Sequence, residues 1–156
     1  MITAIDSSVL LAIFNAESNG TCWLEALIRA RREGRLILCE VVYAEIAPNF
    51  DSSKLLDQRL ENLGIAVTPI DRLASWEAGK TFQRYRQSGG PREYLIPDFL
   101  IAAHAMVHAD RLAATDRGYL RRWFNDLNLL VPMDDPNCLK PGSRSKTGGR
   151  RRRGRR

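Results

Sequence analysis

Four acidic residues stand where apolar segments begin or end, although they are spread over more than a hundred positions: Asp6, Glu45, Asp98 and Asp116. An acid at the edge of a core costs free energy unless a partner compensates its charge, and a divalent cation is the simplest such partner. Two strand-end aspartates and two helix-borne acids could meet around one or two Mg²⁺ or Mn²⁺ ions, which prefer carboxylate and water oxygens. A metal held in this way favours phosphodiester hydrolysis by an activated water.

Alternating strands and helices must position these acids. Apolar runs predict strands at 1–5, 35–39, 65–70, 111–115 and 127–132. Helical periodicity, caps and breakers predict helices at 9–15, 22–33, 40–48, 52–63, 71–87, 98–109 and 117–124, with a loop at 88–97. This alternation is typical of an α/β fold whose parallel sheet is covered on both faces. Ligands of such sheets gather outside the carboxyl ends of the strands, where Asp6 and Asp116 are expected.

The length and composition indicate one globular domain. A chain of 156 residues with 44% apolar and 27% charged residues is long enough for a single core. We expect no membrane association and a cytoplasmic location, because no apolar run approaches a membrane span and the N-terminus lacks a signal peptide. The three cysteines, Cys22, Cys39 and Cys138, are an odd number without metal-binding spacing, and we expect reduced thiols.

The positive net charge comes from the C-terminal end alone. Residues 140–156 hold nine of the 24 Lys and Arg residues and none of the 18 acids, so residues 1–139 have a net charge of −3. We therefore expect a folded domain at 1–134 and a disordered, Arg-rich tail at 135–156, which has no apolar periodicity. We interpret this tail as a dispensable extension with secondary affinity for RNA.

The four acids and their neighbours resemble the PIN domain family, and within it the VapC-type ribonuclease toxins of toxin–antitoxin systems. The resemblance covers nearly all of residues 1–133. It lies in four segments in order: AIDSSVLLAIF, VVYAEIAP, PDFLIAAHAM and RLAATDRGYLRRWFNDLNLLVP. The resemblance implies a three-layer α/β/α sandwich, a Mg²⁺-dependent endoribonuclease with Mn²⁺ as an alternative, a homodimer, and inhibition by a small VapB-like antitoxin.

The resemblance also assigns roles to individual residues. Asp6, Glu45, Asp98 and Asp116 match the family's acidic quartet, and Ser7 and Thr115 match positions that often bear hydroxyls near the metal. We expect Asp6, Asp98 and Asp116 to bind the metal directly or through water, and Glu45 to orient a water or hold a second ion. Some relatives add another acid after the last aspartate, but Gly118 and Tyr119 follow Arg117 here, which weakens the case for a second metal.

Simpler interpretations exist for each of these residues. Asp6 and Asp98 could be helix caps and nothing more, and Asp116 could lie in a surface turn. Glu40 competes with Glu45, but we expect it only to open its helix. His104 and His108 have the spacing of a zinc pair without the accompanying glutamate, so we expect packing or surface roles.

Two alternatives to a nuclease have weaker support in the sequence. A catalytically weak RNA-binding or partner-binding PIN module is the main one, and four acids in the family's order argue against it. A phosphomonoesterase is disfavoured because the DSS segment after Ile5 lacks a second aspartate.

Overall fold

The computed structural model describes residues 1–90, 96–115 and 122–132. Four parallel strands form one sheet in the order β3-β2-β1-β4. The strands are β1 (Ile2–Ile5), β2 (Arg35–Leu38), β3 (Ile65–Val67) and β4 (Arg111–Ala113). The helices are α1 (Ser7–Phe14), α2 (Gly20–Glu33), α3 (Glu40–Ile46), the 3₁₀ turn η1 (Ala47–Asn49), α4 (Ser53–Leu63), α5 (Arg72–Gln87) and α6 (Ile96–His108).

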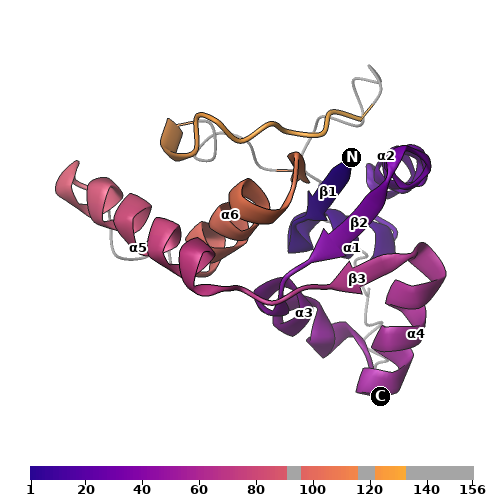
Figure 1. Ribbon diagram of the computed structural model, residues 1–156. Coiled ribbons are helices and arrows are strands. Elements are labelled where there is room, and N and C mark those ends of the chain that lie inside the picture. Colours follow the sequence, from indigo (N-terminus) through magenta and orange to yellow (C-terminus); the bar gives the residue numbers. More distant parts are fainter. Residues whose placement is uncertain (91–95, 116–121, 133–156) are drawn as a thin grey trace, which may run out of the picture.

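Helices cover both faces of the sheet, which confirms the expected three-layer α/β/α arrangement. The α5–α6 pair lies on one side, and α6 packs directly on β1 and β4, while α1, α2 and α4 lie on the other side (Figure 1). Because every strand is parallel, each chain crossing returns through a helix, and all carboxyl ends of the strands meet at one edge of the sheet. This edge is where Asp6 leaves β1 and where residues 114 and 115 leave β4.

Polar side chains fix the beginnings of several helices, and α1 begins at Ser7 rather than at the predicted residue 9. The side chains of Asp6, Ser52 and Asp71 accept hydrogen bonds from backbone N–H groups in the first turns of α1, α4 and α5. The helix α4 ends at Gly64, whose φ of 67° is in the left-handed region. A side chain there would also meet the Arg31 guanidinium, because a Cβ would lie 2.2 Å from its Nε.

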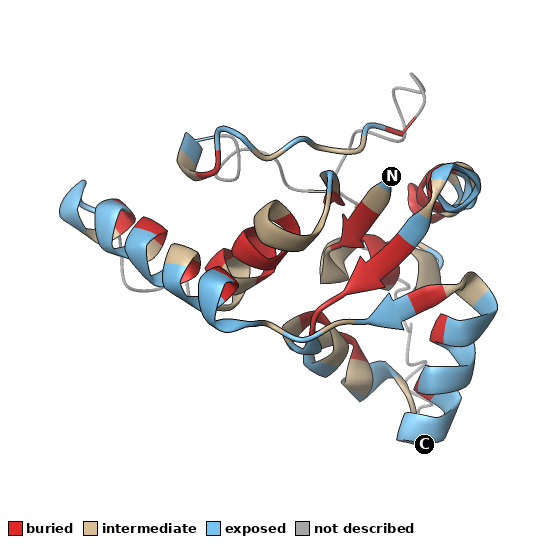
Figure 2. Cartoon of the chain, viewed as in Figure 1, coloured by how far each residue is buried: buried red, intermediate tan, exposed pale blue. Residues whose placement is uncertain are grey.

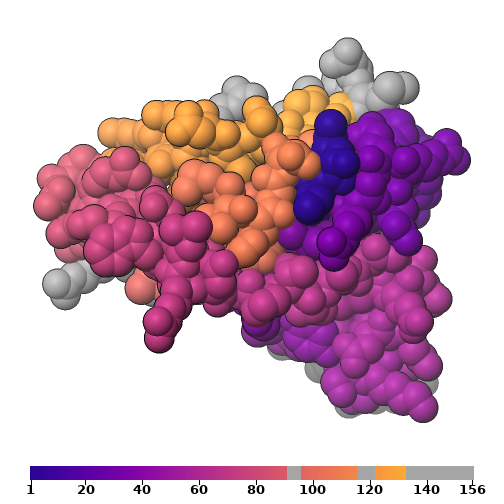
Figure 3. Space-filling model, viewed as in Figure 1, coloured from indigo at the N-terminus to yellow at the C-terminus, as the bar shows by residue number. Residues whose placement is uncertain are grey.

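The core lies on the sheet and on the inner faces of the helices (Figure 2). On the α6 side it contains a group of aromatic rings centred on Phe99, whose ring centroid lies 5.3 Å from those of Phe82 and Tyr85 and 5.8 Å from that of Phe124. The Trp123 ring packs edge-on against Tyr85 at 5.3 Å. Segment 122–132 therefore forms one continuous surface with α5 and α6, as the space-filling view shows (Figure 3).

Several element boundaries differ from the sequence-based expectation. Helix α2 begins at Gly20 rather than residue 22, β3 ends at Val67 rather than residue 70, and α6 begins at Ile96 rather than residue 98. The last difference arises because proline fits the first turn of a helix, so Pro97 does not delay the start of α6. The predicted strand at 127–132 pairs with β4 at only one position, Leu129 opposite Leu112.

The cysteines only partly follow the expectation of reduced thiols. Cys39 is a free, buried thiol, and burial raises its pKa. Cys22 is disulfide-bonded, contrary to the expectation. The odd number of cysteines indicated reduced thiols, but three cysteines still allow one disulfide. The predicted tail at 135–156, and with it the domain boundary, lies outside the described residues. Within residues 1–90, 96–115 and 122–132, each helix is too short or too polar to cross a bilayer.

Candidate functional site

Asp6 lies directly after β1 and caps α1. Its backbone N–H continues the sheet by donating to the Ala113 carbonyl at 2.9 Å. Its Oδ2 atom accepts a hydrogen bond from the Ser8 backbone N–H at 3.1 Å and a second one from the Ser8 hydroxyl. The interpretation of Asp6 as a helix cap is therefore confirmed. The same bonds hold a partly buried carboxylate at the carboxyl edge of the sheet.

Ser8 joins the end of β1 to the end of β4. The Thr115 backbone N–H donates to Ser8 Oγ at 3.2 Å, so a single hydroxyl contacts both the Asp6 carboxylate and the chain leaving β4. Thr115 is partly buried there, at the edge where it was predicted, and it directly precedes Asp116. Asp116 itself lies outside the described residues, and its role as a metal ligand stays a prediction.

Asp98 lies in the first turn of α6 as its third residue, so it is not the N-cap that the simpler interpretation required. Asp110, which follows α6, bonds through its backbone N–H to the Ile2 carbonyl at 2.9 Å, at the amino end of β1. Helix α6 therefore ends at the amino edge of the sheet and begins toward the carboxyl edge. Asp98 is thus placed toward the edge where Asp6 lies, and its partly buried carboxylate suits the positive end of the helix dipole.

Glu45 lies in the last turn of α3, a helix that contacts both α1 and α6. The three helices associated with Asp6, Glu45 and Asp98 thus pack together. A negative charge is unfavourable at the carboxyl end of a helix, and within the described residues the partly buried Glu45 carboxylate has no hydrogen bond or ion pair. A bound cation would compensate this charge.

Glu40, the competitor of Glu45, already has a structural partner. It opens α3 as expected, and its Oε2 accepts a hydrogen bond from the Ile70 backbone N–H at 3.0 Å. This bond ties the start of α3 to the segment between β3 and α5. The structure therefore gives Glu40 a structural role and leaves Glu45 as the candidate for chemistry.

Part of the predicted metal centre lies among the described residues. Among residues 1–90, 96–115 and 122–132, no group of three or more His, Cys, Asp or Glu side chains lies close enough to hold a metal. The predicted ligand set includes Asp116, which is not among these residues. The donors that are described, Asp6, Asp98 and Glu45, are all carboxylates, and this chemistry fits Mg²⁺ or Mn²⁺.

The two histidines have structural roles, as expected. His104 is 1% exposed, and its Nε2 lies 2.9 Å from the Thr68 hydroxyl at the end of β3. Burial, with a smaller contribution from His108, lowers the pKa of His104 from 6.5 to about 4, although Glu40 and Asp71 act in the opposite direction. The His108 Nε2 atom lies 3.2 Å from Asp71 Oδ2 at the start of α5. Both rings thus fasten α6 to the segment between β3 and α5.

We expect the folded protein to lose stability between pH 6.5 and pH 4 because of His104. An unfolded chain binds a proton on this residue below about pH 6.5, whereas the folded protein resists it until about pH 4. The contribution of a neutral His104 to the free energy of unfolding is therefore fully present above pH 6.5. It falls as the pH is lowered from 6.5 to 4, by at most about 3 kcal/mol. Urea unfolding at several pH values should show a shallower pH dependence for His104→Leu than for the wild type; equal slopes would contradict this account.

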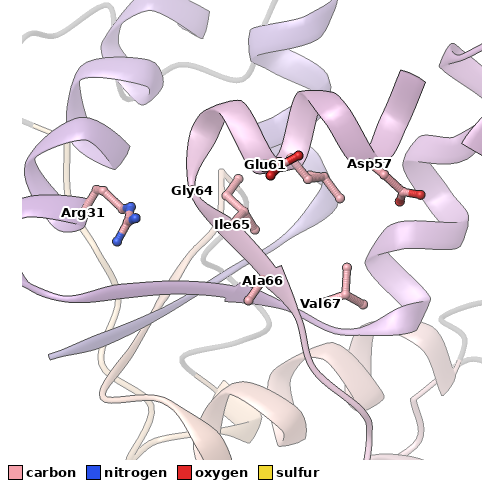
Figure 4. Close-up of a pocket in the computed structure, with 8 residues that line it drawn as sticks. Arg31, Asp57, Glu61, Gly64, Ile65, Ala66 and Val67 are labelled. Carbon is pink, nitrogen blue, oxygen red and sulfur yellow. The ribbon is translucent and has the colours of Figure 1, made fainter. Parts of the chain in front are cut away.

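A surface hollow lies away from the predicted acids. It has a volume of about 520 Å³ and is bordered by α4 and β3, with the carboxylates of Asp57 and Glu61 and the guanidinium of Arg31 around it (Figure 4). The residues that line it do not include Asp6, Glu45 or Asp98. Its position beside the edge strand β3 therefore separates it from the carboxyl end of β1.

Sequence reasoning missed the role of Ser8. The hydroxyl predicted near Asp6 was that of Ser7, and this prediction stays untested, but the hydroxyl that contacts the Asp6 carboxylate belongs to Ser8. A signal was available, because a carboxylate at the N-cap accepts from residues two and three positions later. The link from Ser8 to Thr115 could not be found from sequence, because it spans 107 positions.

Comparisons with known proteins agree on the fold. The family model of the PIN domain matches residues 3–123. A search of curated proteins found no match. Among solved structures, a chain of VapBC2 from Rickettsia felis, bound to a DNA fragment from their promoter, matches with a TM-score of 0.63 and 17% identity. The match covers 83% of this chain and 97% of that chain.

Two further structures are similar to a comparable degree. A chain of VapBC-1 from nontypeable Haemophilus influenzae has a TM-score of 0.60 and 18% identity, with 83% of this chain and 96% of that chain covered. A chain of a toxin–antitoxin complex from Klebsiella pneumoniae has a TM-score of 0.57 and 14% identity, with 83% and 97% covered. At these identities the structural matches establish the fold. The family model spans most of the chain, and together with the strand-end Asp6 it leads to one conclusion: the chain belongs to the PIN domain family.

Proposed function

We propose that this protein is a Mg²⁺-dependent endoribonuclease that acts as the toxin of a VapBC-like toxin–antitoxin pair. Membership of the PIN domain family supports a nuclease. The observation that carries the proposal is the link at the carboxyl edge of the sheet, where Ser8 contacts both the Asp6 carboxylate and the residue before Asp116. Asp6 and Thr115 follow neighbouring strands, and an aspartate directly after Thr115 would suit a cation shared with Asp6.

The acidic residues would have different roles in the proposed reaction. Asp6, Asp98 and Asp116 would hold the cation, and Glu45 would orient the attacking water or hold a second ion. When bound, the cation would activate that water and offset the charge that develops on the phosphate. The bonds from Ser8 to Asp6 fix the carboxylate before substrate arrives, which reduces the reorganisation needed during reaction.

The proposed biological setting comes from the structural neighbours. VapBC proteins and a toxin–antitoxin complex share this fold, which supports a small VapB-like antitoxin as partner of this chain. We further propose a homodimer, RNA as the substrate, and the cytoplasm as the location, where RNA and antitoxin would both be met. A small reading frame with a DNA-binding motif directly upstream of the gene would support the pairing.

The direct test is cleavage of RNA by the purified protein with Mg²⁺. We expect cleavage that stops when a chelator removes the metal and resumes when Mg²⁺ or Mn²⁺ is restored, because the carboxylates alone supply no counter-charge to a phosphate. Gel analysis of a structured RNA and a single-stranded RNA gives the readout. Cleavage that is insensitive to the chelator, or no cleavage by antitoxin-free protein, would contradict the proposal.

Glu45 and Glu40 offer a matched pair on one helix. We expect Glu45→Gln to lower the cleavage rate by about tenfold or more, because a water-orienting or metal-holding carboxylate is lost. Glu40→Gln should leave the rate nearly unchanged and cost about 1 kcal/mol of stability or less, because the bond to the Ile70 N–H is exposed and the glutamine oxygen can still accept it. Initial rates and urea unfolding of both variants separate the two effects; equal loss of activity would remove Glu45 from the mechanism.

A weakly catalytic RNA-binding or partner-binding module remains the second candidate. The partly buried position of Asp6 as a helix cap favours it, since this geometry serves the fold whether or not a metal binds. Growth inhibition on expression distinguishes the two. If Asp6→Ala bound RNA and inhibited growth as the wild type does, the binding module would be the better description.

A further inference from the structure

The hydroxyl of Ser8 makes two bonds whose directions are fixed by chemistry. A backbone N–H can only donate, so Ser8 Oγ must accept from Thr115 N at 3.2 Å. An ionised carboxylate can only accept, so the single hydroxyl proton must point to Asp6 Oδ2. The hydroxyl is thus held in one orientation, and its bond to the carboxylate is charge-assisted.

These bonds lie just beyond the end of the strand ladder. The pairing of β1 with β4 ends at Ile5 opposite Ala113, and the Asp6 N–H bond to the Ala113 carbonyl is the backbone hydrogen bond that follows it. At the next step along β4 the Thr115 N–H bonds to Ser8 instead of to a backbone group of the neighbouring strand. Ser8 therefore bridges the two segments that leave the sheet here, at Asp6 after β1 and at Thr115 after β4.

We infer that Ser8 is a positioning residue of the proposed metal centre, which sets the Asp6 carboxylate against the chain that leads into Asp116. This inference rests on the proposed function. It differs from an ordinary capping role, because the Ser8 backbone N–H bonds to Asp6 Oδ2 at 3.1 Å and would still do so without the hydroxyl. Substitution of the side chain therefore removes the link to Thr115 and one of two bonds to Asp6, while the cap of α1 stays.

A serine in the first turn of α5 provides a matched control. Asp71 caps α5 as Asp6 caps α1, but the Ser75 hydroxyl is exposed and donates to the Asp71 carbonyl at 2.8 Å, whereas the Ser8 hydroxyl contacts the Asp6 carboxylate and the Thr115 N–H. Ser8→Ala and Ser75→Ala thus make the same chemical change at the starts of two capped helices. Ser8→Thr keeps the hydroxyl and should restore what Ser8→Ala loses.

The test measures Mn²⁺ binding to the full chain by electron paramagnetic resonance, with RNA cleavage and thermal unfolding of the same samples. We expect Ser8→Ala to weaken Mn²⁺ binding by about tenfold or more, as loss of a partner that orients a metal ligand generally does. Ser75→Ala should bind as the wild type does, and Ser8→Thr should recover most of the affinity. If Ser8→Ala does not fold, Ser8→Cys, which keeps the volume but is a poor donor, takes its place in the comparison.

The outcomes separate the two proposals. Equal Mn²⁺ affinity of Ser8→Ala, Ser75→Ala and wild type would overturn the positioning role and leave the metal-dependent nuclease intact. Failure of Ser8→Thr to recover affinity, with the variant folded, would also overturn it. Absence of Mn²⁺ binding by the wild type would overturn the proposed metal centre and, with it, this inference.

Discussion

Asp98→Asn is expected to lower the rate of RNA cleavage by about 10²- to 10³-fold while the protein stays folded. A carboxylate that helps to hold a cation at a reacting phosphate contributes several kcal/mol to the transition state, and each 1.36 kcal/mol is a factor of ten in rate. The amide keeps the size of the side chain but loses its charge. Stability should change by much less than activity, because the amide keeps the shape of the side chain and the helix-dipole contribution of an acid in the first turn is about 1 kcal/mol or less.

Asp71→Asn is the matched control for Asp98→Asn. Asp71 also lies at the start of a helix, where its Oδ1 accepts from the Ala74 N–H at 2.8 Å, but it contacts His108 rather than the carboxyl end of β1. The backbone hydrogen bond, followed by the charge of His108, lowers the pKa of Asp71. This variant should cleave RNA at nearly the wild-type rate. Similar loss of activity in both variants would point to a change of fold and not to a lost ligand.

Phe99→Ala is expected to lower the free energy of unfolding by about 3–5 kcal/mol, the largest loss of stability that we predict. The ring is 1% exposed and lies among Phe82, Tyr85 and Phe124 at centroid distances of 5.3 to 5.8 Å. Its removal leaves a cavity that the surrounding rings fill only partly. A domain of this size is generally stable by about 5–15 kcal/mol, so the loss is a large share of the total.

Urea unfolding followed by circular dichroism measures this loss, and Trp76→Ala is its control. The Trp76 side chain is larger than that of Phe99 but is 62% exposed on α5, and the Lys80 ammonium lies over its ring. Its removal should cost about 1 kcal/mol or less. If Trp76→Ala were as destabilising as Phe99→Ala, the aromatic core would not be organised around Phe99. Variants of the neighbouring residues Asp98 and Phe99 thus test the proposed catalysis and the stability of the fold separately.

The sequence by itself determined the fold class and the family. Apolar runs interrupted by caps and breakers predicted every strand of the four-stranded sheet, because strand and helix patterns are local properties of the chain. The order of the acids, with Asp6 at the end of β1 and Asp98 at the start of α6, followed from the same local pattern. Glu40 was also interpreted correctly as the residue that opens α3.

Only the tertiary structure decided which side chains meet. The choice of Ser8 over Ser7 depends on a contact with Thr115, 107 positions away, and the structural role of Glu40 depends on the Ile70 N–H, 30 positions away. The contact of the buried His104 with Thr68, 36 positions away, likewise depends on how α6 lies against the segment that follows β3. Such contacts are set by how the helices lie on the sheet, and this arrangement is a property of the whole core that no short segment contains.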